Sequence, residues 1–413
     1  MLKFLFNKSI DSIKLGVDGL LKIITGLIVI KIISNIGDDS LLANFSQLKM
    51  LSALLISITS SAFIIGLNKL SMKYARNDFI GNMNFLIFTI SVAIILVIVF
   101  FEGKLSALMG RRTECFLFLS FLLLISGYLA NYFLGCKIAS LNNKLLSSAK
   151  IYSTTLSFFA FLSVYFVGVN VWLGLYIYII SYYVFLALFL FDKNEVKNLF
   201  FSFSINVNVL KDAINIIFLT FLSSVVFPSC IVYLRYDMST LYGWEYVSFW
   251  EAEWQLSSLF LLVISPVLSV IVTTYVTSKS RVGGLNKQII LKLISTIVVL
   301  AVIFSSVVYF FNELLLSTFF NSMMIVGDSS IELLLLINLF RLVSVVIFYI
   351  LYVISDTKKL VFGELFFLLT FALANVVLKD SQVNSSIPLL ISVLICFLYF
   401  ILILVKTDEY KTP

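Results

Sequence analysis

The first long apolar stretch of the chain carries three charged residues at helical spacing. Lys14, Asp18 and Lys22 follow one another at intervals of four residues, which places them on one face of a helix. Lys22 lies nine residues into a predicted membrane helix over 13–35, near mid-depth at about 1.5 Å per residue. A charge there costs about 2.5–3.5 kcal/mol on insertion scales. Two interpretations remain open: a structural Asp18–Lys22 pair that joins helices, or a Lys22 that lines a hydrated cavity.

A second deep cation lies near the C-terminal end. Arg341 is in the middle of INLFRLVSVVIFYILY and shares a helix face with Asn338 and Ser344. A guanidinium suits bidentate recognition of phosphate, so we expect Arg341 to hold an anion. Glu364 is a candidate partner for Arg341 or for a bound cation. Arg235 ends a predicted helix over 210–235, where a solvated rim residue and a headgroup ligand are equally good interpretations.

Carboxylates and amides supply the remaining candidates. In WEYVSFWEAEWQLSS (244–258), Glu251 and Gln255 share a helix face, whereas Glu253 points about 160° away. We therefore expect Glu251 to face inward and Glu253 to lie at the membrane interface. Asn44 and Gln47 form a neutral hydrogen-bonding pair, suited to sugars or to helix contacts. Lysines within about a turn of a predicted helix end are expected to extend toward water; they are Lys14, Lys150, Lys211 and Lys292.

Several kinds of chemistry are excluded. The chain has no histidine, so histidine cannot serve as a metal ligand or as a general acid or base. Any proton transfer must use Asp or Glu. No CxxC spacing and no GxxxxGK[ST] loop occur, so we expect no metal, no cofactor and no direct coupling to ATP. The cysteines fall in or beside apolar runs and are expected to be small buried hydrophobes: Cys115, Cys136, Cys230 and Cys396.

The elements that position these residues must be membrane helices. Hydrophobic residues make up 61% of the chain and charged residues 12%, against roughly 45–50% and about 25% in an average soluble domain. So few charges cannot cover the surface of a soluble protein of this size. Soluble enzymes, nucleic-acid binders and disulfide scaffolds are therefore excluded. The start has no small-residue cleavage site, so we expect the first helix to stay in the mature protein.

About twelve apolar stretches are long enough to cross a bilayer. A loop over 192–209 divides them into a six-helix lobe over 1–191 and a six-helix lobe over 210–413, a count that suggests a parallel repeat. We expect an all-α integral membrane protein. The stretches are 13–35, 41–67, 83–102, 115–135, 147–168, 170–191, 210–235, 246–275, 285–311, 330–354, 360–378 and 387–405.

The distribution of Lys and Arg predicts the orientation. With both termini cytoplasmic, the inside loops hold 16 such residues and the outside loops 5. Cytoplasmic loops are enriched in Lys and Arg. The sequence therefore predicts a multi-pass protein of the bacterial inner membrane with both termini in the cytoplasm. Three of the five outside cations share one loop: Lys104, Arg111 and Arg112.

Two stretches resemble O-antigen flippases, which form part of the polysaccharide transporter branch of the multidrug, oligosaccharidyl-lipid and polysaccharide (MOP) exporter superfamily. They are LLKIITGLIVIKIISNIGDDSLLANFSQL (20–48) and FWEAEWQLS (249–257). In the second, Trp250, Ala252 and Ser257 match the family, whereas Glu251 and Gln255 replace its Gln and Lys. Glu364 resembles the Glu of the family's eleventh helix. Helix count and the six-plus-six division agree over nearly the whole chain.

The resemblance implies a transporter and not an enzyme. Its cargo would be an undecaprenyl-pyrophosphate-linked oligosaccharide repeat unit, moved to the periplasmic leaflet by two lobes in a V around a cationic cavity. The lipid tail would leave beside helices one and eight. We expect H⁺ or Na⁺ as the coupling ion, a monomer, and contacts with other O-antigen assembly proteins but not with nucleic acid. The expected ligands are Lys22, Arg341 and Arg235 for pyrophosphate, Asn44, Gln47 and Gln255 for sugars, and Asp18, Glu251 and Glu364 for the ion.

Three other functions remain open. A multidrug or small-cation antiporter of the same superfamily would share the architecture but should favour acidic cavity residues. An O-antigen polymerase or ligase would have a similar hydropathy profile, yet such chains carry one long periplasmic loop. A membrane scaffold without transport would merely pair its deep charges.

Overall fold

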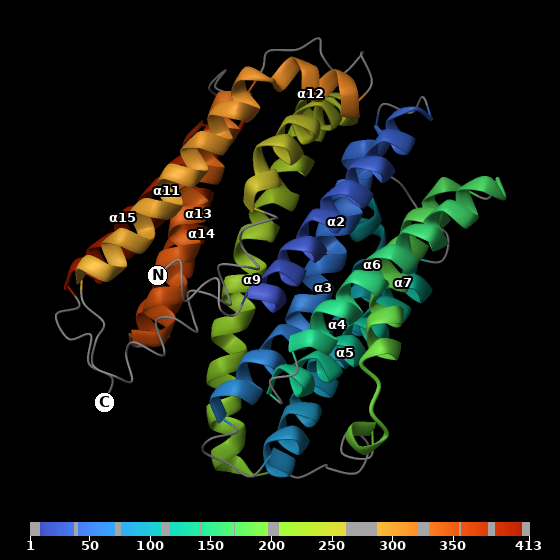
Figure 1. Cartoon of the computed structure of the whole chain (residues 1–413), viewed down its shortest axis with the longest axis vertical. Coiled ribbons are helices and arrows are strands. Elements are labelled where there is room, and N and C mark those ends of the chain that lie inside the picture. The colour runs from blue at the N-terminus through green and yellow to red at the C-terminus, as the bar shows by residue number, and fades with distance from the viewer. Residues whose placement is uncertain are drawn as a thin grey trace. The chain divides into compact units, whose positions relative to one another are not determined.

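The computed structural model is helical throughout the residues it describes (Figure 1). A bilayer offers the backbone no hydrogen-bond partners, so a membrane-spanning chain must satisfy its backbone groups internally, as helices do. Eight of the described helices are long and apolar enough to cross a membrane. The predicted all-α, multi-pass membrane architecture is therefore confirmed. The described residues are 9–36, 40–70, 76–108, 116–139, 143–168, 170–196, 206–261, 287–320, 330–354, 357–378 and 385–406.

Each of the twelve predicted stretches falls on a helix. The largest differences in the ends are at α4, which begins at residue 76 and not 83, and at α9, which ends at 242 and not 235. The helix at 244–261 matches the predicted stretch 246–275 as far as it is described. A short additional helix, α12 (Asn312–Phe319), was not predicted because its eight residues cannot cross a bilayer.

The chain divides into two compact units, and each is described by itself. Unit 1 comprises Met1–Thr25 and Asn44–Val232, and unit 2 comprises Gly26–Ala43 and Tyr233–Pro413. Three of the described helices contribute to both units: α2 (Ser9–Ser34), α3 (Leu41–Leu70), whose first three residues belong to unit 2, and α9 (Val207–Tyr242). The predicted lobes, 1–191 and 210–413 with a linker over 192–209, stay a prediction.

Unit 1 contains most of α3 (Leu41–Leu70) and the helices α4 (Arg76–Leu108), α5 (Phe116–Ala139), α6 (Asn143–Phe166) and α7 (Val171–Phe189). The helices α6 and α7 pack along each other, and α7 also packs on α5 (Figure 1). The connection between α6 and α7 is short. Gly168 adopts a φ of 75°, which suits glycine, and the Asn170 side chain accepts a hydrogen bond from the Trp172 amide at 3.0 Å. This side-chain cap satisfies one of the unpaired amides at the start of α7.

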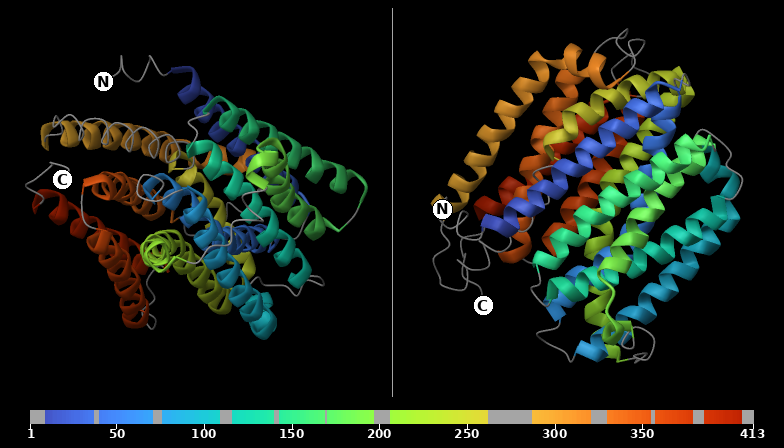
Figure 2. Two further views of the ribbon diagram at one scale, coloured as in Figure 1. Left: turned by 90° about the horizontal axis from the view of Figure 1, so that it is seen from below. Right: turned by 45° about the vertical axis from the view of Figure 1, so that its right-hand side comes forward.

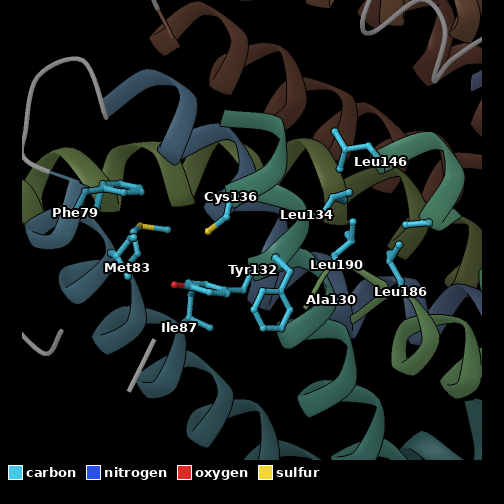
Figure 3. Packing of buried hydrophobic residues seen from close by; sticks show 14 of the residues in the cluster. Phe79, Met83, Ile87, Ala130, Tyr132, Leu134, Cys136, Leu146, Leu186 and Leu190 are labelled. Carbon is cyan, nitrogen blue, oxygen red and sulfur yellow. The ribbon is translucent and has the colours of Figure 1, made fainter. Parts of the chain in front are cut away.

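The core of unit 1 surrounds Tyr132 of α5. Its ring belongs to a buried cluster with Met83 and Ile87 of α4 (Figure 3). The Tyr132 hydroxyl donates to the carbonyl of Glu195 at 3.0 Å. Close by in sequence, Lys137 Nζ lies 2.7 Å from Asp192 Oδ2, and this hydrogen bond holds the pKa of the Asp192 carboxyl below its usual value. Both contacts fasten the segment after α7 to α5.

Unit 2 contains the helix at 244–261 and the helices α11 (Lys287–Phe310), α12, α13 (Ile331–Ile354), α14 (Thr357–Leu378) and α15 (Ile387–Lys406). Both α13 and α14 pack on α15 (Figure 2). A buried cluster joins Leu42, at the start of α3, to Leu256, Phe320 and Ile331. The helix at 244–261 is therefore packed into the core of unit 2.

Candidate substrate and ion sites

Lys22 and Asp18 form an ion pair within unit 1. Lys22 Nζ lies 3.1 Å from Asp18 Oδ2 and 5.1 Å from the centre of the Tyr182 ring on α7. The side chain of Asp18 is 7% exposed, but that of Lys22 is 43% exposed. The pair predicted as one interpretation is therefore present. The other interpretation, a Lys22 that lines a hydrated cavity, stays a prediction.

Asp18 connects α2 to α6. Its Oδ1 accepts a hydrogen bond from the Thr154 hydroxyl at 3.4 Å. Lys150, one turn before Thr154, is close enough to Asp18 and Lys22 for the charges to interact. The expectation that Lys150 extends from a helix end is wrong, because α6 begins at residue 143 and Lys150 is half-buried. Lys211 and Lys292 are exposed, as expected, and the side chain of Lys14 lies outside the described residues. We call Asp18, Lys22 and Lys150 the unit 1 charge cluster.

Tyrosines of α7 face this cluster, and sequence reasoning missed them. The Lys22 ammonium lies over the ring of Tyr182 in a cation–π contact. Tyr182 also packs edge-on against Tyr183, with ring centres 5.1 Å apart. Tyr178 shares a side-chain hydrogen bond with Thr25 of α2. In the sequence these tyrosines belong to an almost wholly apolar helix, where aromatic residues are expected at a lipid surface. Their spacing of about one turn, at 178 and 182, is the only signal that could have placed them on one face.

Asn44 and Gln47 are buried in unit 1. Gln47 is fully buried, and its Nε2 donates to the carbonyl of Val232 on α9 at 2.9 Å. Asn44 is 3% exposed. The Gln47 amide therefore makes a contact between helices, which is one of its two predicted roles. Sugar binding by Asn44 and Gln47 stays a prediction.

Arg235 and Glu251 form a buried ion pair in unit 2. Arg235 Nη2 lies 2.6 Å from Glu251 Oε2, and the two side chains are 2% and 3% exposed. Gln255 donates to Glu251 Oε1 at 3.0 Å, and the guanidinium lies 5.9 Å from the Trp250 ring centre. The interpretation of Arg235 as a solvated rim residue is wrong, because α9 continues to Tyr242. The inward position of Glu251 agrees with its helix face. Roles of the three polar residues toward substrate or ion stay predictions.

Glu253 is buried, so its predicted interfacial position is wrong. It is fully inaccessible, and its Oε2 accepts hydrogen bonds from the Ser330 amide at 2.9 Å and from the Ser330 hydroxyl at 2.7 Å. Ser330 directly precedes α13, and a carboxylate is favourable at a helix N-terminus. The error arose because the helix at 244–261 is covered on both faces, whereas one polar face was assumed.

Arg341 of α13 and Glu364 of α14 are neighbours within unit 2. Both side chains are half-buried, and their charges interact. A direct ion pair between them stays a prediction, as does the binding of a cation by Glu364. Asn338, one turn before Arg341, is buried and donates to the Ser257 hydroxyl at 2.8 Å. Ser344 instead bonds the carbonyl of Phe340 in its own helix at 2.8 Å.

Metal ligation has no candidate site in the part of the chain that is described. No group of three or more His, Cys, Asp or Glu side chains there could hold a metal ion. Three of the four cysteines are buried and not in disulfides: Cys136, Cys230 and Cys396. Cys115 lies outside the described residues. The cysteines thus occupy the buried positions expected of small hydrophobes.

No family model matches the sequence, and neither does any curated protein. Solved structures do match the fold. An inward-facing multidrug resistance MATE family transporter of the MOP superfamily aligns with a TM-score of 0.71 and 16% identity, over 96% of this chain and 100% of that one. An outward-facing form of such a transporter gives 0.67 and 17%, over 96% and 95%. A MOP superfamily transporter from Pyrococcus furiosus, described as having a binding pocket of reverse polarity that suggests a different function, gives 0.67 and 17%, over 97% and 96%. The chain therefore has the fold of MOP superfamily transporters.

Proposed function

We propose that the chain is a flippase that moves undecaprenyl-pyrophosphate-linked O-antigen repeat units from the cytoplasmic to the periplasmic leaflet of the bacterial inner membrane. One observation carries the proposal: Lys22, in the first membrane helix, keeps 43% of its side chain exposed although it is paired with Asp18. A cation held at this place by a carboxylate and an aromatic ring, with a second lysine close enough to add positive charge, is suited to receive a phosphate. Transport proceeds by alternating access, with both termini cytoplasmic.

The chemistry of such a substrate matches the groups that each unit offers. Pyrophosphate is a concentrated anion, for which Lys22 is the candidate ligand in unit 1 and Arg341 the candidate in unit 2. Sugar rings require hydrogen-bonding groups and flat apolar surfaces, and Tyr182 and Tyr178 supply both beside Lys22. A transporter must release its cargo, so partial neutralisation of Lys22 by Asp18 is an advantage.

The polarity of the candidate residues favours this function over its rival. Multidrug transport is named for neighbours of this fold, and it remains the alternative because fold does not determine function. A cationic drug would be repelled by the unit 1 charge cluster, which holds two lysines and one carboxylate. The neighbour from Pyrococcus furiosus is likewise described by the polarity of its pocket and a different function.

A cation gradient is the proposed driving force, with H⁺ or Na⁺ taken up at Asp18 or Glu251. Each charge that crosses the membrane contributes about 2.3 kcal/mol per 100 mV. Asp18 combines a carboxylate with a neighbouring hydroxyl, Thr154. The combined variant Asp18→Asn and Glu251→Gln should lose gradient-dependent transport. Full sensitivity to the gradient in that variant would contradict the assignment of the coupling site.

The test is surface-polysaccharide display in a host that lacks the gene. The intact chain should restore polymerised O-antigen, and Lys22→Gln should reduce it by about tenfold or more, because a charged hydrogen bond contributes about 1.5–3 kcal/mol. Lipid-linked repeat units should accumulate on the cytoplasmic face.

Lys292→Gln is the matched control, since it removes an exposed lysine of α11. It should support normal display, and insertion of every variant should be verified by membrane fractionation. Normal display in the deletion host without any complementing gene would overturn the proposal. Drug sensitivity of that host would then favour the multidrug antiporter.

A further inference from the structure

A groove follows the contact between α4 and α5 in unit 1. Its volume is about 280 Å³, and it is lined by Ile95, Ile98, Val99, Phe118, Ser120 and Phe121. Both helices belong to the spans that are long and apolar enough to cross a membrane. Phe118 and Phe121 are 61% and 45% exposed, and no charged side chain lines the groove. Its surroundings are therefore lipid hydrocarbon and not water.

A cavity of about 200 Å³ lies behind the groove. It shares Ile98 and Ser120 with the groove, so the two spaces adjoin at these residues. Residues of α3, α7 and α9 form its other walls, among them Ser52, Tyr176 and Ser229. Small serine side chains on three helices leave this space open. It has no charged lining residue, so it continues the apolar character of the groove into unit 1.

The occupant must be apolar and must come from the membrane. Apolar cavities of about 150 Å³ exclude water and take up molecules such as benzene, so this cavity is large enough for the end of a hydrocarbon chain. The groove lies near one end of the spans, since Ser120 is only two residues from Phe118. At the same end, Lys104 is exposed and directly precedes Leu105, which lines the cavity. An apolar slot beside an exposed lysine matches a phospholipid, with the acyl chain in the slot and the phosphate near Lys104.

We propose that one acyl chain of a bilayer phospholipid enters unit 1 between α4 and α5 and fills the groove and the cavity. Residues of α3, α7 and α9 form the inner walls of the cavity, which suits a resident lipid and not a tail that must move with its cargo. This site is separate from the proposed substrate residues, because Lys22 and the tyrosines beside it line neither space. The lipid would thus lie between helices of unit 1, and its binding would not depend on the identity of the transported substrate.

The experiment uses the full chain in vesicles of phosphatidylglycerol and phosphatidylethanolamine, with a diazirine at the end of the phosphatidylglycerol acyl chain. After illumination, mass spectrometry locates the labelled residues. Label should appear on cavity residues that do not face lipid, Leu54 and Leu123, which are 8% and 3% exposed. Ser120→Leu should abolish this label by filling the passage between groove and cavity.

Two further variants keep the test decisive. Ser52→Leu fills the cavity from α3 and should remove the inner label while Phe118 and Phe121 stay labelled. Ser163→Leu adds the same volume on the exposed face of α6 and should change nothing. Absence of inner label in the intact chain, or its persistence in both cavity variants, overturns the proposal. Displacement of the label by an equimolar polyprenyl phosphate would overturn the assignment to a resident phospholipid. Normal O-antigen display in the deletion host would overturn the flippase function but would not affect the lipid site. Each proposal can therefore be contradicted without the other.

Discussion

Two ion pairs of the described helices, Lys22–Asp18 and Arg235–Glu251, differ in exposure. Arg235 and Glu251 are almost completely buried, whereas Lys22 of the pair with Asp18 is open to its surroundings. A fully buried pair is held by geometry and is costly to break, because one uncompensated charge then remains. An exposed cation can exchange its partner. The same chemistry thus gives a fixed contact in unit 2 and a candidate binding group in unit 1.

Removing one member of the buried pair should therefore destabilise the protein more than removing both. Arg235→Leu should cost about 3–5 kcal/mol, because Glu251 keeps its charge without a counter-ion. The combined change Arg235→Leu and Glu251→Leu should recover most of that loss. Thermal unfolding of the purified variants in detergent measures both effects. Equal midpoints for the single and the double variant would show that the pair contributes no coupling.

The charged residues within the helices could be predicted from the sequence, but most of their contact partners could not. Arg235 was placed at a helix end, as a rim residue or a headgroup ligand, because the apolar run ends near it, yet the helix continues for seven residues as a more polar segment. Glu253 was placed by helix angle alone, and angle does not reveal that α13 begins beside it. The spacing of Tyr178 and Tyr182 indicates a shared helix face but not the contact of Tyr182 with Lys22, which joins residues 160 positions apart.

The contact between α14 and α15 depends on a close approach at Gly363. A Cβ there would lie 2.5 Å from Phe400 Cε1 and 3.0 Å from Tyr399 Cε1. Phe400 is 2% exposed and packs against Phe348, with ring centres 6.1 Å apart, so it has little room to move. Glycine thus sets the distance between these two helices.

Gly363→Ala should destabilise unit 2 by about 1–3 kcal/mol, the usual cost of forcing an extra carbon into a packed core. Gly103→Ala is the control, because a Cβ there meets nothing within 4 Å, and alanine favours helix by about 0.5–1 kcal/mol. Midpoints of thermal unfolding should fall for the first variant and not for the second. A lowered midpoint for both variants would indicate that helix packing at Gly363 is not the cause.

The hydropathy pattern predicted the positions of the helices better than it predicted the contacts of single residues. Runs of about 20 apolar residues are imposed by bilayer thickness, which is why all twelve stretches coincide with helices. Helix ends differed because the extensions beyond the apolar runs, such as residues 76–82, contain charged and polar residues and do not lengthen the apolar run. The length of α12 is not set by bilayer thickness. Its eight residues are too few to cross a membrane, and the helix is held by the packing of its buried Leu316.

For the whole molecule, the fold agrees with the MOP superfamily although identity to its solved members is 16–17%. Helix count and length predicted a membrane protein of about twelve helices, and the resemblance of residues 20–48 and 249–257 to a MOP family predicted this architecture. The arrangement of polar residues was not, because membrane helices tolerate many sequences at lipid-facing positions. Function must accordingly be argued from the site residues and tested separately.

The orientation in the membrane remains a prediction of the charge distribution. An alkaline phosphatase fused after residue 112 should be active, and fusions after residues 196 and 406 should be inactive, because inside loops hold 16 cations and outside loops 5. Enzyme activity in intact cells, normalised to the amount of fusion protein, is the measurement. The opposite pattern would reverse the orientation and place Lys104 and its neighbours in the cytoplasm.

The tryptophans give the molecule an optical probe of one helix. Of four in the chain, Trp244, Trp250 and Trp254 lie in the helix at 244–261, and the rings of Trp250 and Trp254 stack 5.2 Å apart at 13°. The Arg235 guanidinium lies over one of these rings. Ultraviolet fluorescence of the unlabelled protein is thus dominated by indoles near the Arg235–Glu251 pair, with Trp172 as the single emitter in unit 1. Rearrangement of that pair during a transport cycle would register as a change in emission wavelength, without any attached dye.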